Sequence, residues 1–148
     1  MKIESVNNIK KFIIKNKNKR IIVIGTTCTG KSTMLKNIPN AQDMDELIFP
    51  QLTKEQEKFV CQTPWTIEIG KKMSQLVVDK IKVEKGKALF GTVVLDCDLI
   101  IYLDISDKLL KERTLKRNAN YNDAKNMQKY IFSEIKKTNK QIFKYNVI

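Results

Sequence analysis

Short, nearly uninterrupted apolar runs alternate along the chain with longer segments whose apolar positions recur every three or four residues. The runs at 20–24, 88–94 and 99–103 are typical of strands buried on both faces of a parallel sheet. Shorter segments at 41–44 and 143–147 predict two further strands. The alternation predicts an α/β fold of three layers, in which helices cover a central, mostly parallel sheet of about five strands.

Helical periodicity and the signals at segment ends predict the helices that connect these strands. Thr53 and Gln56 have the spacing of a capping box. Thr63 is predicted as the N-cap of the next helix, with Pro64 at its first position. The predicted helices are 4–17, 30–37, 53–60, 65–84, 107–117 and 122–138. No repeat or linker-like segment interrupts this pattern, so residues 1–148 are interpreted as one domain.

Residues 25–32 read Gly-Thr-Thr-Cys-Thr-Gly-Lys-Ser and match the phosphate-binding pattern GxxxxGK[ST] in full. Glycines in such a loop permit backbone torsions that turn N–H groups toward phosphate oxygens. Lys31 would place its charge on the β- and γ-phosphates, and Ser32 would offer its hydroxyl to Mg²⁺. A predicted buried strand precedes the pattern and a predicted helix follows it, as a phosphate loop requires. The alternative interpretation is a structural turn.

The motif therefore predicts ATP and Mg²⁺ as cofactors. ATP is favoured over GTP because the chain has no NKxD-like sequence that would bind guanine. Ser32 is the metal-binding residue that the motif itself predicts. The predicted nucleotide contacts are Gly25, Thr26, Thr27, Cys28, Thr29, Gly30, Lys31, Ser32 and Thr33.

Three features together resemble the P-loop small-molecule kinases, a group that includes nucleoside monophosphate kinases, shikimate kinase and polynucleotide kinases. These features are the 25–32 motif, the acidic pair Asp43-Met44-Asp45, and the segment 99–113, which reads LIIYLDISDKLLKER. The resemblance spans about residues 20–118. It implies a P-loop NTPase fold whose five parallel strands have the 20–24 strand at the centre, and a short lid near 113–121.

The resemblance also implies roles for individual side chains. Lys31, Arg113 and Arg117 would stabilise the negative charge of the transferred phosphoryl group. The two arginines are one helical turn apart and would therefore lie on the same helix face. The alternatives are a solvated basic helix end, or pairing of Arg113 with Asp107 or Glu112. Asp43 would join Ser32 as a ligand of Mg²⁺, and Asp45 would take the proton of the acceptor hydroxyl.

The spacing between Lys31 and Asp45 is shorter than this family leads us to expect, because Pro39 ends the first helix early. Asp43 and Asp45 are therefore alternatively interpreted as loop residues or as a cap for a helix at 46–48. Asp96 is a further metal candidate, whereas Asp98 is expected to border the next strand. Phe49, Pro50, Gln62 and Trp65 fall in the acceptor-binding region of the family, with burial in the core as the alternative.

Composition limits the other interpretations. The net charge of +12 invites a nucleic-acid partner, but the basic residues are almost all lysines scattered along the chain, apart from a cluster at 10–20. Nucleic-acid binding is therefore not favoured. The chain has no histidine and its three cysteines form no CxxC pair, which excludes a histidine base and the usual zinc sites and predicts free thiols. No apolar segment is long enough for a membrane span or a signal peptide, so a cytoplasmic location without membrane contact is expected.

These observations predict an ATP-dependent phosphotransferase that moves the γ-phosphate to a small-molecule acceptor, a nucleoside or nucleotide. The alternatives are a polynucleotide 5′-hydroxyl kinase, which would use the positive charge, and a P-loop nucleotide-binding module without an acceptor.

Overall fold

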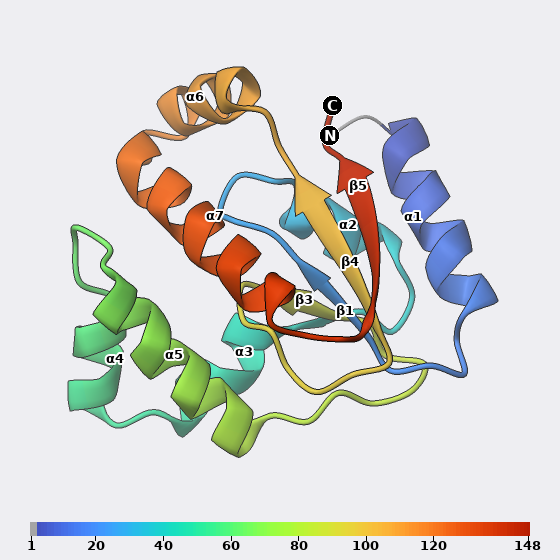
Figure 1. Cartoon of the computed structure of the whole chain (residues 1–148), viewed down its shortest axis with the longest axis horizontal. Helices are drawn as coiled ribbons and strands as arrows, with labels where there is room; N and C mark the ends of the chain where they lie inside the picture. Colours follow the sequence, from blue (N-terminus) through green and yellow to red (C-terminus); the bar gives the residue numbers. More distant parts are fainter. Residues whose placement is uncertain (1–2) are drawn as a thin grey trace.

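The computed structural model describes residues 3–148, and Figure 1 shows how the elements of this range are arranged. Within the range there are five strands, seven α-helices and one 3-10 helix, η1 (Phe49–Gln51). The strands are β1 (Ile21–Ile24), β2 (Gln42–Asp43), β3 (Leu89–Gly91), β4 (Leu99–Asp104) and β5 (Gln141–Asn146). The helices are α1 (Ile3–Lys15), α2 (Lys31–Asn37), α3 (Met44–Ile48), α4 (Lys54–Val60), α5 (Ile67–Lys80), α6 (Asp107–Lys116) and α7 (Tyr121–Lys136).

The strands form one sheet in the order β2-β3-β1-β4-β5, and every neighbouring pair is parallel. β1 is central, with Val23 in register with Phe90 of β3 and Ile101 of β4. All four residues of β1 are buried, as the uninterrupted apolar run predicted. The prediction of an α/β fold with a parallel five-stranded sheet is confirmed.

Helices cover both faces of the sheet, which gives the three-layer arrangement visible in Figure 1. Because side chains alternate along a strand, Ile21 and Val23 of β1 pack in a core that includes α1 and α2. Ile22 and Ile24 point to the opposite face and pack in a second core with α3, α5 and α7. Two separate apolar cores therefore fix β1, and with it the loop that follows.

One predicted helix begins and ends elsewhere than expected. The segment predicted as 65–84 forms α5 only over Ile67–Lys80, and its N-cap is Thr66, whose hydroxyl accepts from the backbone N–H of Ile69 at 3.3 Å. The prediction that Thr63 caps this helix with Pro64 at its first position is therefore wrong. The physical reason is Trp65, whose indole folds back over Gly70 so that the helix starts only after it.

The carboxyl edge of the sheet is where the chain leaves the strands in irregular segments. β3 ends at Gly91, earlier than the predicted 88–94, and the chain then turns away from the sheet. α2 and α3 both begin directly at this edge, after β1 and β2 respectively. Residues from several distant segments therefore meet at one edge of the sheet.

No helix of residues 3–148 is both long and apolar enough to cross a membrane. All three cysteines are free thiols, as predicted.

Candidate functional site

The 25–32 loop connects β1 to α2 and has two residues in the left-handed backbone conformation. Gly30, directly before α2, has φ 97°, which glycine adopts without steric cost. Cys28 has φ 67°. Threonine side chains fix the loop: Thr26 Oγ1 donates to the Ala124 carbonyl at 2.6 Å, and Thr29 Oγ1 donates to the Thr26 carbonyl at 2.8 Å. The loop is therefore held in one shape by contacts within itself and to α7.

The Lys31 side chain curls back over this loop. Its Nζ donates to the carbonyls of Gly25 at 2.5 Å and Thr26 at 2.7 Å, and to Thr29 Oγ1 at 3.2 Å. Burial lowers the pKa of the Lys31 ammonium to about 8, and the charge of Asp45 opposes that shift. The ammonium is thus held by neutral oxygens, which the charged oxygens of an anion would outcompete.

Asp43 and Asp45 stand where β2 passes into α3. The Asp43 carboxylate accepts from the backbone N–H of Asp45 at 3.0 Å, so Asp43 is the N-cap of α3. The cap predicted as an alternative is thus correct for Asp43. Partial burial, together with the charge of Asp43, raises the pKa of the Asp45 carboxyl, and Lys31 opposes that shift. Both carboxylates line the same cleft as Lys31, so the short α2 does not remove them from the loop.

The two arginines predicted to act together lie in different places. Arg117 is the exposed C-cap of α6 and lines the cleft. Arg113 does not line it: its Nη1 donates to the Cys28 carbonyl at 3.0 Å and its Nη2 to the Ile148 carbonyl at 3.2 Å. The alternative pairing of Arg113 with Asp107 is absent among the described residues, since Asp107 instead accepts from Lys125 at 2.6 Å.

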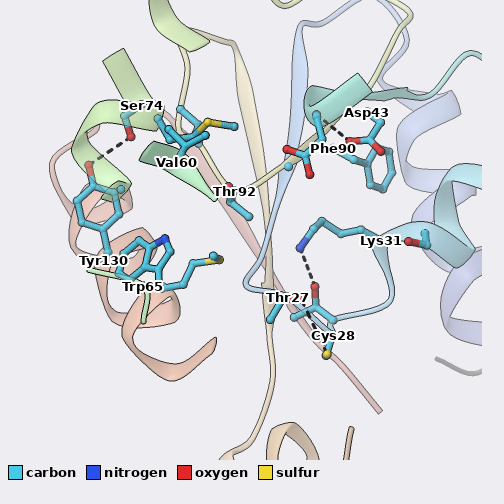
Figure 2. Close-up of a pocket in the computed structure, with 18 of the residues that line it drawn as sticks. Thr27, Cys28, Lys31, Asp43, Val60, Trp65, Ser74, Phe90, Thr92 and Tyr130 are labelled. Carbon is cyan, nitrogen blue, oxygen red and sulfur yellow. Dashed lines mark hydrogen bonds between the residues drawn. The ribbon is translucent and has the colours of Figure 1, made fainter. Parts of the chain in front are cut away.

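These groups surround a cleft of about 340 Å³ that has two chemically distinct ends, shown in Figure 2. We call the first the loop end; it contains the residues Thr27, Cys28, Thr29, Gly30, Lys31, Ser32, Asp43, Asp45 and Arg117. The second, the aromatic end, is formed by α5, α7 and neighbouring segments; it contains Val60, Trp65, Ile69, Gly70, Met73, Ser74 and Tyr130. Figure 2 shows Trp65, Tyr130 and Ser74 on one side and Lys31 and Cys28 on the other. Phe49 and Thr92 also line the cleft.

The rings of the aromatic end are fixed by packing and hydrogen bonds. Trp65 and Tyr130 meet edge to face, with ring centroids 5.8 Å apart and planes at 60°. A Cβ on Gly70 would lie 2.7 Å from Trp65 Cζ2, so only glycine permits the indole to lie so close to α5. The Tyr130 hydroxyl donates to Glu134 Oε1 at 3.1 Å and shares a 3.2 Å hydrogen bond with Ser74 Oγ. Burial raises the pKa of the Tyr130 hydroxyl.

The structure brings together most, but not all, of the residues singled out in the sequence. All nine positions from Gly25 to Thr33 were predicted nucleotide contacts, and the six from Thr27 to Ser32 line the cleft. Residues outside the cleft lining are Gly25, Thr26, Thr33, Pro50, Gln62 and Arg113. Sequence reasoning missed Thr92, Ser74 and Tyr130. Only the packing of α5 against α7 brings the last two together, and no local pattern marks either position.

Asp96, proposed from the sequence as a metal candidate, lies elsewhere. It accepts from Arg20 Nη1 at 3.1 Å, beside Asp98, which pairs with Arg20 Nη2 at 3.1 Å. Hydrogen bonds from Arg20 lower the pKa of both carboxyls. These residues precede β4 and β1 and so lie at the amino edge of the sheet, opposite the cleft. The prediction for Asp96 is wrong for this reason, whereas Asp98 does border the next strand.

The oxygen groups beside the loop suit a hard cation. Ser32 and Asp43 both line the loop end and supply a hydroxyl and a carboxylate, the ligand types that Mg²⁺ prefers. Within residues 3–148 no cluster of three or more His, Cys, Asp or Glu side chains is arranged to hold a metal ion. A cation here would therefore take its other ligands from water and from a bound phosphate, as Mg²⁺ commonly does.

No protein-family model matches the chain, and no curated protein matches it significantly.

Proposed function

We propose that the chain is an ATP-dependent phosphotransferase, a single P-loop kinase-like domain that moves the γ-phosphate of ATP to a small-molecule acceptor, a nucleoside or nucleotide. The observation that carries this proposal is the meeting of Lys31, Asp45 and Arg117 in one cleft. The three come from separate segments: the 25–32 loop, the start of α3 and the end of α6. Phosphoryl transfer requires cations around the phosphate and a carboxylate at the acceptor, and this cleft offers both.

The loop end would hold the triphosphate. Lys31 would exchange its loop carbonyls for β- and γ-phosphate oxygens, and Arg117 would meet charge that develops on the transferred group. Ser32 and Asp43 would hold Mg²⁺, which when bound neutralises phosphate charge. Residues 117–120 connect α6 to α7 and contain Arg117. They would form the core of the short lid expected near 113–121.

Asp45 would act at the acceptor. The acceptor oxygen forms a bond to the γ-phosphorus, the bond from that phosphorus to the β–γ bridging oxygen breaks, and ADP leaves with the electron pair. The acceptor proton passes to the Asp45 carboxylate. The raised pKa of Asp45 suits this role, because a weaker acid is a stronger base once it is ionised.

The arrangement favours a small acceptor over a polynucleotide. The basic cluster at 10–20 runs along α1 and into the amino end of β1, whereas the cleft lies at the carboxyl end of β1. A nucleic acid drawn to those lysines would lie away from Lys31. Three free cysteines suit a reducing compartment, and we place the protein in the cytoplasm, where ATP and Mg²⁺ are abundant.

The test is a transfer assay with Mg²⁺ and γ-labelled ATP. Nucleosides, nucleoside monophosphates, shikimate-like alcohols and 5′-hydroxyl oligonucleotides would be offered separately. Label should appear on a small acceptor, and Lys31→Ala should abolish both transfer and ATP binding. Lys36→Ala, which removes an exposed lysine of the same helix, is the matched control. ATP hydrolysis without label on any acceptor would overturn the proposal, as would tight ATP binding by the Lys31→Ala variant.

A further inference from the structure

Charge is distributed unequally between the two ends of the cleft. Among the described residues that line it, the charged side chains are Lys31, Asp43, Asp45 and Arg117, and all four belong to the loop end. At the aromatic end the polar side-chain groups are the hydroxyls of Ser74 and Tyr130 and the indole N–H of Trp65, and none of them is charged. A phosphate or carboxylate group bound there would lose its hydration without gaining a cation, which is costly. The aromatic end therefore suits an uncharged body.

The shape of the aromatic end favours a planar body. Trp65 and Tyr130 present two ring surfaces whose mutual angle is fixed by their edge-to-face contact. Gly70 lies under the indole, so the ring cannot move toward α5 to make room. Met73 adds a polarisable side chain to the same wall. A heteroaromatic ring stacks well on such surfaces, and its polar edge atoms would meet the Ser74 and Tyr130 hydroxyls.

Asp43 and Asp45 at the loop end favour a hydroxyl over a phosphate as the group of the acceptor that is phosphorylated. A phosphate acceptor is already ionised near neutral pH, needs no base, and would be repelled by Asp43 and Asp45. A hydroxyl acceptor has a proton to give and gains from a carboxylate nearby. The cations of this end, Lys31 and Arg117, suffice for one triphosphate tail together with Mg²⁺. A second phosphate group would leave negative charge uncompensated.

We infer that the acceptor is an uncharged nucleoside, whose base lies against Trp65 and Tyr130 and whose hydroxyl is phosphorylated beside Asp45. This inference rests on the proposed phosphotransferase function and narrows it, since nucleoside monophosphates and carboxylated ring alcohols are excluded as preferred acceptors. The nucleoside oxygen forms the new bond to the γ-phosphorus and its proton passes to the Asp45 carboxylate. ADP is the leaving group, so no other reactant is required.

Trp65 is the one tryptophan of the chain, so its fluorescence reports directly on the aromatic end. With the loop end saturated by a non-hydrolysable ATP analogue and Mg²⁺, the protein would be titrated with adenosine, guanosine, cytidine and thymidine. The matching 5′-monophosphates form the second arm, and calorimetry follows both arms. At least one nucleoside should bind, and should do so about tenfold or more tightly than its own monophosphate. A monophosphate that binds as tightly as its nucleoside, or no nucleoside binding by either readout, would overturn the inference.

Substitutions at the aromatic end distinguish a loss of nucleoside binding from a general loss of stability. Trp65→Leu should weaken nucleoside binding about ten- to a hundredfold by calorimetry, because base stacking is lost. Phe59→Leu, which alters an exposed aromatic of α4 outside the cleft lining, should leave it unchanged. Gly70→Ala should also weaken nucleoside binding, since the new Cβ displaces the indole, and ATP affinity should stay the same. If Trp65→Leu fails to fold, Gly70→Ala and Trp65→Phe still test the role of the aromatic end. Trp65→Phe keeps a stacking ring, so this variant should bind the nucleoside within about threefold of wild type.

The two proposals fail in different ways. If ATP does not bind, or if label reaches no acceptor while nucleosides still bind, the phosphotransferase function is wrong. If label reaches a monophosphate or a carboxylated alcohol more readily than any nucleoside, the function holds and the nucleoside inference is wrong.

Discussion

Arg113 Nη1 donates to the backbone carbonyl of Cys28 at 3.0 Å, across 85 positions of the chain. Cys28 has a left-handed φ of 67°, a conformation that costs a non-glycine residue about 1–3 kcal/mol. The guanidinium therefore stabilises a strained point of the 25–32 loop from outside the cleft. Arg113 is therefore a positioning residue for the 25–32 loop. Arg117, one helical turn later, lines the cleft.

Arg113→Met should weaken ATP binding by about tenfold and change kcat by less than threefold, because the loop loses one charge-assisted hydrogen bond but keeps Lys31. Calorimetry with ATP and Mg²⁺ measures the first effect and steady-state kinetics the second. Lys116→Met, which removes an exposed cation of the same helix, is the control. A variant with wild-type ATP affinity would show that the contact to Cys28 does not position the loop.

Arg117→Met should give the opposite result. The KM for ATP should stay within about threefold of wild type, while kcat falls by about a hundredfold or more, because charge on the transferred group is met only in the transition state. Steady-state kinetics against Lys116→Met separates the two parameters. An unchanged kcat would show that Arg117 is a solvent-exposed residue without a role in transfer. Lys31 would then be the cation that stabilises the transferred phosphoryl group.

The fold could be predicted because its signals are local. The β-branched run at 21–24 is buried on both faces of the sheet, and that requires a central parallel strand wherever the other strands lie. Helix ends were less certain, since they depend on tertiary contacts. Thr63 and Thr66 both have the residue type of an N-cap, and it is the packing of Trp65 on Gly70 that selects Thr66.

The site could be predicted only in part for a similar reason. The loop end is continuous in sequence at 25–32, so its pattern marks it directly. The aromatic end combines Trp65 with Tyr130, 65 positions later, and their contact depends on how α5 packs against α7. The spacing of Arg113 and Arg117 predicts that both lie on one face of a helix. Because α6 ends at Lys116, Arg117 lies beyond the helix and its side chain has different surroundings from that of Arg113.

Asp45→Asn should lower kcat by about a hundredfold or more, because the acceptor hydroxyl loses its base. In the wild type, kcat should rise with pH through the raised pKa of Asp45, so the acid limb lies above the range of an ordinary aspartate. The pH profile of kcat between pH 4 and 8 measures this, and the limb should be absent from Asp45→Asn. Glu46→Gln, which neutralises the adjacent exposed carboxylate, should keep the limb. A limb that survives in Asp45→Asn belongs to another group.

Asp98→Asn should lower the melting temperature and leave kcat and the Mg²⁺ dependence unchanged, because Asp98 accepts from Arg20 at the amino edge of the sheet. The pKa of Asp98 is depressed, so its stabilising contribution is present near neutral pH and is lost as the pH falls through that lowered pKa. Thermal unfolding at pH 7 and pH 3 should therefore show a larger difference between wild type and variant at pH 7. Asp96→Asn should likewise keep its Mg²⁺ dependence, and an altered one would return Asp96 to the list of metal ligands.

ATP binding should take up a proton at Lys31 when the pH is high. In the free protein, burial lowers the pKa of this ammonium from 10.5 to about 8, whereas phosphate oxygens beside it would favour the charged form and raise the pKa again. At pH 7 the free side chain is already mostly protonated, so uptake should be about a tenth of a proton per site. At pH 9 it is mostly neutral, so uptake should approach about one proton, and affinity should be about tenfold lower than at pH 7.

Calorimetry in two buffers of different ionisation enthalpy measures that uptake directly. The phosphates of ATP, with a second pKa of about 6, are ionised at both pH values and contribute little to the difference. Lys36→Met should show the same uptake as wild type, because Lys36 is an exposed residue of the same helix and does not line the cleft. Equal uptake at pH 7 and pH 9 would mean that Lys31 does not change its protonation when ATP binds, and therefore that its ammonium is not transferred from the loop carbonyls to the phosphates.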